Sequence, residues 1–260
     1  MLKDTLNLIR ARELILTWTN RIIKARYQQS VLGSLWIIIQ PIASVAVLTT
    51  IFTFFIPVDT GKTPYIVFSY TALVPWTLLS GALSDMTSSL VENMQLITKI
   101  YFPREVLPFS ALLARIFDFI VSYVVLFFLL LYYRIEIQPL AWLFLPLVIA
   151  IQLVLMFGLG LGLSAMNVFY RDVRPLLGLV IQIWFYASPI IYPLSMVPER
   201  IRPFYFLNPM AGILESYRAI LVDGTLPGPY LLFSAGLAVV IFMLGYWFFK
   251  RVEFQFADII

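Results

Sequence analysis

Histidine and cysteine, on which most general bases, thiolate nucleophiles and zinc sites depend, do not occur among the 260 residues of this sequence. It also lacks an Asp-x-Asp pair, the usual carboxylate arrangement for a metal-bound donor. Gly61-Lys62-Thr63 matches the end of a phosphate-binding loop, but that loop requires a glycine where this chain has Ile56. We therefore predict no catalytic residue, no metal site and no ATP site.

One ionised pair lies within a long apolar segment. Arg115 and Asp118 stand three residues apart, so they share one face of a helix. Charges at membrane depth are costly and often mark functional sites. Arg115 lies only about two turns from the polar end of its segment, however. Pairing that stabilises the fold is therefore favoured over binding of a substrate.

Aromatic residues make up 16% of the chain. Some of them cluster, and rings with hydroxyl tips can stack on sugar rings without holding any one of them tightly. Ordinary packing is the alternative for each residue. The candidate group consists of Trp36, Trp184, Phe185, Tyr186 and Tyr192.

Six long apolar segments must position these residues. Each can cross a hydrocarbon layer of about 30 Å as a helix, and a backbone in lipid must satisfy its own hydrogen bonds. With 61% hydrophobic and 12% charged residues, the chain could not bury this surface as a soluble protein. We predict an all-α membrane protein, a single domain over residues 1–260, with transmembrane helices at about 34–56, 65–83, 109–133, 140–166, 175–194 and 230–249.

The basic residues indicate the orientation of these spans. An even number of spans places both termini on one side, and cytoplasmic segments carry an excess of Lys and Arg. Twelve such residues fall on the side of the termini, five fall on the other side, and Arg115 falls within a span, which accounts for all 18. Both termini are predicted to be cytoplasmic.

Residues 5–29 precede the first span and are predicted to form an amphipathic helix at the membrane interface. Its apolar face carries a tryptophan and its opposite face carries basic residues, which suits a helix at the level of the lipid headgroups. A docking surface for a partner is compatible with this pattern. The apolar face consists of Leu8, Ala11, Leu14, Ile15, Trp18 and Ile22.

Residues 92–108 are too polar to cross the membrane and too apolar for a solvated loop. A short helix is predicted here, ended by Pro103, and Pro108 opens the next span. Exposed apolar side chains on the cytoplasmic side favour docking of another protein. The face in question consists of Leu96, Ile97, Ile100 and Tyr101.

Residues 189–229 lie outside the membrane in this topology and are apolar despite many prolines. We predict a re-entrant hairpin of two short helices, at about 199–207 and 210–222, hinged at Asn208-Pro209. Irregular backbone survives at membrane depth only when packed against protein. An amphipathic hairpin resting on the membrane surface is the alternative.

The fourth span carries a face of small residues. Gly158, Gly160 and Gly162 precede Ser164 and Ala165. Such a face lets helices approach closely, so tight helix packing is predicted. Because no strand precedes the glycines, a dinucleotide-binding turn is excluded.

Four segments together carry a family resemblance. Residues 93–108 read N-x-x-L-I-x-K-x-x-F-P-R-E-x-L-P, and residues 167–173 read NVFYRDV. Arg26-Tyr27 leads into SVLGSLW at 30–36, and Ser188-Pro189 precedes Asn208-Pro209 in the outside segment. In this order, over nearly the full chain, the pattern resembles the ABC type-2 permeases that export bacterial cell-surface polysaccharides.

The resemblance implies a homodimer in the bacterial inner membrane, bound to two copies of a cytoplasmic ABC ATPase subunit that holds the ATP and Mg²⁺. The substrate would be a lipid-linked polysaccharide, with O-antigen preferred over capsule or teichoic acid, and nucleic acid would not be a partner. Membrane lipids would surround the spans. The implied ATPase-coupling residues are Asn93, Leu96, Ile97, Lys99, Ile100, Tyr101, Phe102, Pro103, Arg104 and Glu105, supported by Tyr170, Arg171 and Asp172 of the second cytoplasmic loop.

The same resemblance implies a path for the polymer between two subunits, lined by the aromatic group named above. Arg26, at the cytoplasmic entry to the first span, would receive the lipid diphosphate. The outside hairpin would help to close the path and contact the lipid carrier through Asn208, Pro209, Tyr217 and Arg218.

Two other functions remain open. An ABC type-2 permease for a small amphiphile or drug would share this architecture. A membrane-embedded glycosyltransferase or acyltransferase would need a catalytic base and a donor site, for which this sequence offers no candidate.

Overall fold

The computed structural model describes residues 11–28, 32–61, 63–100 and 102–257, and these ranges contain helices and no strand. The predicted all-α class is therefore confirmed. The α-helices are α2 (Arg12–Tyr27), α3 (Trp36–Thr50), α4 (Tyr65–Glu92), α5 (Met94–Lys99), α6 (Val106–Tyr132), α7 (Pro139–Trp142), α8 (Leu145–Phe169), α9 (Val173–Tyr186), α10 (Arg202–Tyr205), α11 (Pro209–Leu221) and α12 (Tyr230–Val252). Short turns flank them, namely η1 (Gly33–Leu35), the π-helical end of the first span η2 (Ile51–Phe55), η3 (Leu194–Met196) and η4 (Glu253–Ala257).

Five helical segments are long and apolar enough to cross a membrane. They are Trp36–Phe55, Tyr65–Glu92, Val106–Tyr132, Pro139–Phe169 and Tyr230–Phe256. The sixth predicted segment, 175–194, is α-helical only as far as Tyr186, where the 14-residue helix α9 ends. A continuous helix over 175–194 is wrong, because the chain leaves the helix after Tyr186, shortly before Pro189, whose ring disfavours helical geometry at Ser188.

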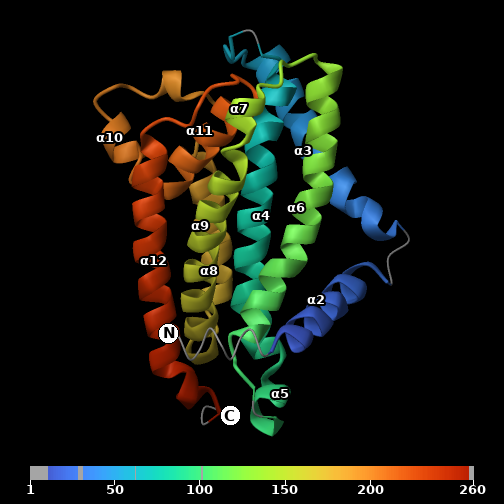
Figure 1. Ribbon diagram of the computed structural model, residues 1–260, viewed down its shortest axis with the longest axis vertical. Coiled ribbons are helices and arrows are strands. Elements are labelled where there is room, and N and C mark those ends of the chain that lie inside the picture. The colour runs from blue at the N-terminus through green and yellow to red at the C-terminus, as the bar shows by residue number, and fades with distance from the viewer. Residues whose placement is uncertain (1–10, 29–31, 62, 101, 258–260) are drawn as a thin grey trace.

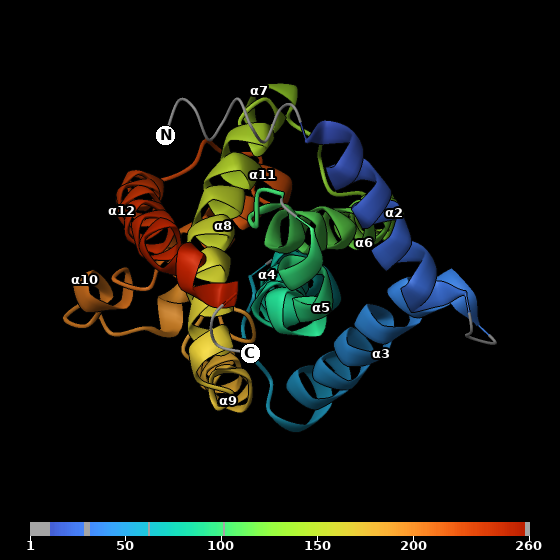
Figure 2. The same ribbon diagram turned by 90° about the horizontal axis from the view of Figure 1, so that it is seen from below.

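Helix α4 forms the centre of the bundle (Figure 1). Seen from below, α3, α6, α8 and α9 surround it (Figure 2). Its most apolar stretch is 78% buried, against 17–28% for the other four membrane-length segments. Ser and Thr hydroxyls on α4 donate to carbonyls three or four residues earlier, as Thr71 does to Val67 at 2.8 Å, so they can be buried without other partners.

Small residues allow α8 and α12 to pack closely together. A Cβ atom added to Gly158 of α8 would overlap the backbone of α12 at Phe242, and one added to Gly245 of α12 would overlap the backbone at Gly158. A Cβ on Gly160 would instead overlap Met86 of α4. The predicted close packing of this face is confirmed at Gly158 and Gly160.

The short elements gather at the two ends of the bundle. Helices α2 and α5 lie with η4 toward one end, here called the α5 end, while α7, α10 and α11 lie toward the other, the α7 end (Figure 1). Helix α2 packs along α6. Ile15 of its predicted apolar face is buried and Leu14, Trp18 and Ile22 are half-buried, whereas Leu8 lies outside the described residues.

Candidate functional site

The predicted coupling segment forms a short helix followed by a bend. Helix α5 ends at Lys99, and α6 begins at Val106, after Pro103 and with Pro108 in its first turn. Ile100 is 57% exposed, whereas Ile97 is 5% exposed. The expectation that Ile97 belongs to an exposed patch is therefore wrong. Tyr101 lies outside the described residues.

Ile97 is buried because the C-terminal turn η4 packs against α5. It belongs to an apolar cluster that includes Phe249 of α12 and Phe256 of η4. Glu105, one of the implied ATPase-coupling residues, is 1% exposed and forms an ion pair with Lys250 of α12. The rest of the segment surrounds a hollow of about 200 Å³ lined by Ile97, Thr98, Lys99, Ile100, Phe102 and Arg104, while Asn93, Leu96 and Pro103 are half-buried.

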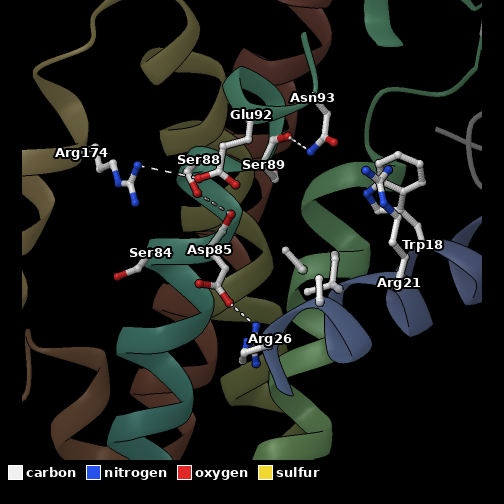
Figure 3. Close-up of a pocket in the computed structure, with 13 residues that line it drawn as sticks. Trp18, Arg21, Arg26, Ser84, Asp85, Ser88, Ser89, Glu92, Asn93 and Arg174 are labelled. Carbon is white, nitrogen blue, oxygen red and sulfur yellow. Dashed lines mark hydrogen bonds and ion pairs between the residues drawn. The ribbon is translucent and has the colours of Figure 1, made fainter. Parts of the chain in front are cut away.

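The second predicted cytoplasmic loop lies at the same end. Tyr170 is 68% exposed, and Arg171 and Asp172 are exposed as well. Just beyond them, Arg174 lies 3.7 Å from Glu92 at the end of α4 (Figure 3). The structure thus brings this loop and the coupling segment together at the α5 end.

A four-charge network ties α2 to the bundle. Arg26 of α2 lies 2.6 Å from Asp85 of α4 and 2.5 Å from Asp118 of α6 (Figure 3 shows the Arg26–Asp85 contact). Arg115 binds Asp85 through two nitrogens, at 2.6 and 3.0 Å, and lies 3.5 Å from Asp118. The Tyr27 hydroxyl donates to Asp118 at 2.7 Å, and burial together with this bond raises the pKa of Tyr27, so the donor stays protonated at neutral pH. We name these five residues the charge network.

The charge network borders a cavity of about 520 Å³ between α3, α4 and α6. Its wall combines the half-exposed indole of Trp36 with the side chains of Gln40, Ser44, Thr77, Ser80 and Ser122. A second cavity, of about 510 Å³, opens on the other side of Arg26 toward Arg21, Glu92 and Arg174 (Figure 3). Arg26, the predicted diphosphate contact, therefore stands between two polar cavities with its guanidinium held by two carboxylates.

The aromatic residues near the end of α9 do not line the cavity that holds Trp36. Trp184 packs edge-on against Trp76 at 5.8 Å, and its indole nitrogen donates to Asn208 at 2.7 Å. Phe185 also contacts Trp76, at 5.8 Å. Tyr186 is 61% exposed, and Tyr192 donates to its carbonyl oxygen at 3.0 Å. Among these, Tyr186 presents the largest free surface.

The predicted hinge at Asn208-Pro209 joins two helices, as expected, although α10 is shorter than predicted. Asn208 caps α11 by accepting from the Met210 amide at 3.0 Å. Its amide nitrogen donates to the Ser188 hydroxyl at 2.9 Å and to the Ala187 carbonyl at 3.3 Å, in the irregular chain that follows α9. Asn208 thus joins the hairpin to the broken end of α9.

Arg218 and Tyr217 hold α11 inside the bundle. Arg218 is 4% exposed, lies 3.7 Å above the Phe68 ring, and donates to Glu215 at 2.9 Å and to the Ile190 carbonyl at 3.1 Å. The buried Tyr217 hydroxyl donates to Gln152 at 2.8 Å. Both side chains are enclosed by protein, so in this conformation they position the hairpin.

Sequence reasoning missed Asp85, the central acid of the charge network. The second span was predicted to end at Leu83, so Asp85 fell beyond it and was given no role. Helix α4 instead continues to Glu92 and carries Asp85 opposite Arg26 and Arg115. The available signal was that Asp85 lies just beyond the predicted second span while Arg115 lies within the predicted third span, where it would need an acidic partner.

The chain matches known proteins over almost its whole length. Residues 13–222 match the family model described as ABC-2 type transporter. O-antigen export system permease proteins RfbA of Klebsiella pneumoniae and Myxococcus xanthus are 29% and 30% identical to the chain, with alignments that cover 95% of both chains and 99% of both chains, respectively. The polysialic acid transport protein KpsM of Escherichia coli is 23% identical over 90% of this chain and 91% of its own length. The family model covers most of the chain, and the structure has five membrane-length helical segments. The chain therefore belongs to the ABC-2 type transporter family.

Proposed function

We propose that the chain is the transmembrane subunit of an ATP-driven exporter that moves lipid-linked polysaccharide of O-antigen type across the bacterial inner membrane. Near full-length similarity to O-antigen permeases supports the substrate class. The absence of an ATP-binding loop from the sequence agrees with hydrolysis on a separate subunit.

The proposed topology has six crossings and places the α5 end in the cytoplasm. Five crossings are the membrane-length helical segments. The sixth consists of α9, about 21 Å long at 1.5 Å per residue, and the irregular chain that follows it. Ser188 and Ile190 of that chain are fully buried, which is the condition for irregular backbone at membrane depth. Helix α2 then lies at the inner interface, and α10 and α11 form a hairpin in the outer leaflet.

Coupling to the ATPase is proposed to pass through α5. The observation that carries this proposal is the 57% exposed Ile100, which directly follows a short helix that the buried Ile97 anchors to the bundle. The exposed Tyr170 loop lies at the same end and would extend the docking surface. In a homodimer of this chain, each copy would present one such docking surface. Closure of the two ATPase subunits on nucleotide would move both surfaces.

Two copies would enclose the polymer between them. A long polymer cannot fit one closed cavity, so it has to move in steps through a continuous path with weak, repeated contacts. Trp36 and Tyr186 are exposed and can supply stacking faces. A lipid diphosphate at Arg26 would replace the carboxylates of Asp85 and Asp118 as partners of the guanidinium.

The test replaces Ile100 with Asp. A charge placed in an apolar protein contact would be buried without a partner, which costs several kcal/mol and should separate the subunits. Ile201→Asp is the matched control, because Ile201 is 53% exposed at the α7 end. We expect Ile100→Asp to abolish co-purification with the ABC ATPase subunit and surface polysaccharide, and Ile201→Asp to retain co-purification.

The readouts are ATPase capture from detergent extracts and surface polysaccharide per membrane-inserted permease. Normal capture and export by Ile100→Asp would refute the docking assignment. A wild-type chain that neither binds the ATPase nor supports polysaccharide export would refute the proposed function itself.

A further inference from the structure

The C-terminal turn η4 folds back against the coupling segment. Helix α12 ends at Val252, and η4 then carries Phe256 into a fully buried position. The Phe256 ring packs against Phe249 at 5.6 Å and against Phe169, the last residue of α8, at 6.0 Å. Ile97 of α5 belongs to the same apolar cluster.

An ionic contact adds to this packing. Lys250 of α12 forms an ion pair with the buried Glu105 and also lies 3.2 Å from Glu253. A buried carboxylate needs a compensating charge, so Lys250 fixes the chain just after Pro103. The guanidinium of Arg104 lies 5.8 Å from the Phe256 ring centre. Both sides of the bend in the coupling segment are thus held by residues from the C-terminal end.

We infer that residues 249–256 position the coupling segment for the ATPase, with Phe256 and Lys250 as positioning residues that do not themselves touch the partner. This inference rests on the proposed docking at α5. The buried side of α5 is fixed to the end of α12, and α12 packs closely on α8 through Gly158 and Gly245. A displacement of α5 by the ATPase would therefore be passed directly to α12 and α8.

The first test compares two phenylalanines of the same turn. Phe256→Ala removes the buried ring, and Phe254→Ala removes a ring that is 76% exposed. We expect Phe256→Ala to bind the ABC ATPase subunit about tenfold more weakly in detergent and to lose export in proportion. Phe254→Ala should match wild type in both assays.

A separate control distinguishes positioning from loss of stability. Leu126 is fully buried in the C-terminal third of α6, away from the α5 end. Leu126→Ala should lower the unfolding temperature while the folded protein still binds the ATPase normally. Equal ATPase affinities for Phe256→Ala and wild type, or equal losses for Phe256→Ala and Phe254→Ala, would overturn the inference.

Charge reversal gives a second test should Phe256→Ala not reach the membrane. Lys250→Glu places three carboxylates together at positions 105, 250 and 253, whereas adding Glu105→Lys restores the original net charge of the cluster. We expect Lys250→Glu to bind the ATPase weakly and the double variant to recover binding. Wild-type binding by Lys250→Glu, or no recovery in the double variant, would contradict the inference. Failure of the proposed function can be told apart from these two outcomes, because in that case the wild-type chain itself would bind no ATPase.

Discussion

At the scale of single residues, the charge network joins four charged side chains from three helices. Two arginines and two aspartates balance one another, and their side chains are 15–28% exposed. Isolated charges in such surroundings carry a large desolvation cost, which close pairing offsets. Because Arg26 belongs to α2 while Asp85 and Asp118 belong to α4 and α6, the same bonds fix α2 to the bundle.

Replacing Asp85 tests this balance. Asp85→Asn leaves two arginines with one carboxylate, so we expect a loss of about 3 kcal/mol in the free energy of unfolding and release of α2 from α4. The measurement is thermal unfolding of the purified protein in detergent. Glu92→Gln on the same helix is the control, because the pair with Arg174 is 3.7 Å long and mainly exposed, and its loss should change stability by less than about 1 kcal/mol. Equal unfolding temperatures for the two variants would show that the network does not stabilise the fold.

At the scale of elements, the irregular chain after α9 is held by hydrogen bonds from the segment that contains α10 and α11. The chain after Tyr186 exposes carbonyl groups that no helix satisfies, and residues elsewhere bind them. Arg218 donates to the Ile190 carbonyl, and the Tyr65 hydroxyl donates to the Ile191 carbonyl at 2.9 Å. Unsatisfied backbone groups are tolerated at membrane depth only with such partners. Helix α11 is therefore part of the structure that permits a short α9.

Glycines on α12 give a prediction at the same scale. Gly245→Ala would force a methyl group against the backbone of α8, so we expect a loss of about 1–3 kcal/mol in stability from overpacking. Gly236 lies on the same helix, and an added Cβ there meets nothing within 4 Å. Gly236→Ala should be neutral or slightly stabilising. Detergent unfolding temperatures of the two variants are compared directly, and an equal or higher value for Gly245→Ala would argue against close α8–α12 packing.

At the scale of the whole molecule, burial is uneven. Among the five membrane-length segments of the described residues, only α4 is enclosed by its own chain, while the other four leave more than two-thirds of their most apolar stretches unburied. Lipid or a second subunit has to cover that surface, since the structure describes one chain alone. This distribution agrees with the proposed homodimer, in which helices other than α4 would meet the partner subunit.

The orientation of the bundle can be tested because the sequence contains no cysteine. Thr98→Cys places a thiol on the exposed side of α5, and Leu226→Cys places one on the exposed chain between α11 and α12. A membrane-impermeant maleimide should label Leu226→Cys in intact spheroplasts and Thr98→Cys only after the membrane is broken. Labelling of Thr98→Cys in intact spheroplasts would reverse the proposed topology.

Composition and periodicity were sufficient for the helical class, for five of the long helices and for the helices flanking Asn208, because apolar length and proline positions act locally. Motif resemblance also pointed to the correct family. The predicted span over 175–194 was wrong after Tyr186, since the partners that make an irregular chain tolerable there, Arg218 and Tyr65, are distant in sequence.

The placement of the candidate site residues was decided by tertiary structure. The sequence alone predicted that Ile97 and Glu105 lie in an apolar segment outside the membrane spans, but their burial depends on Phe256 and Lys250, which lie more than a hundred residues later in the chain. Asp85 likewise became part of a charge network only when α2, α4 and α6 came together. Local patterns determine which segments are helices and which faces are apolar. Contacts between distant segments determine which of those faces remain exposed for a partner.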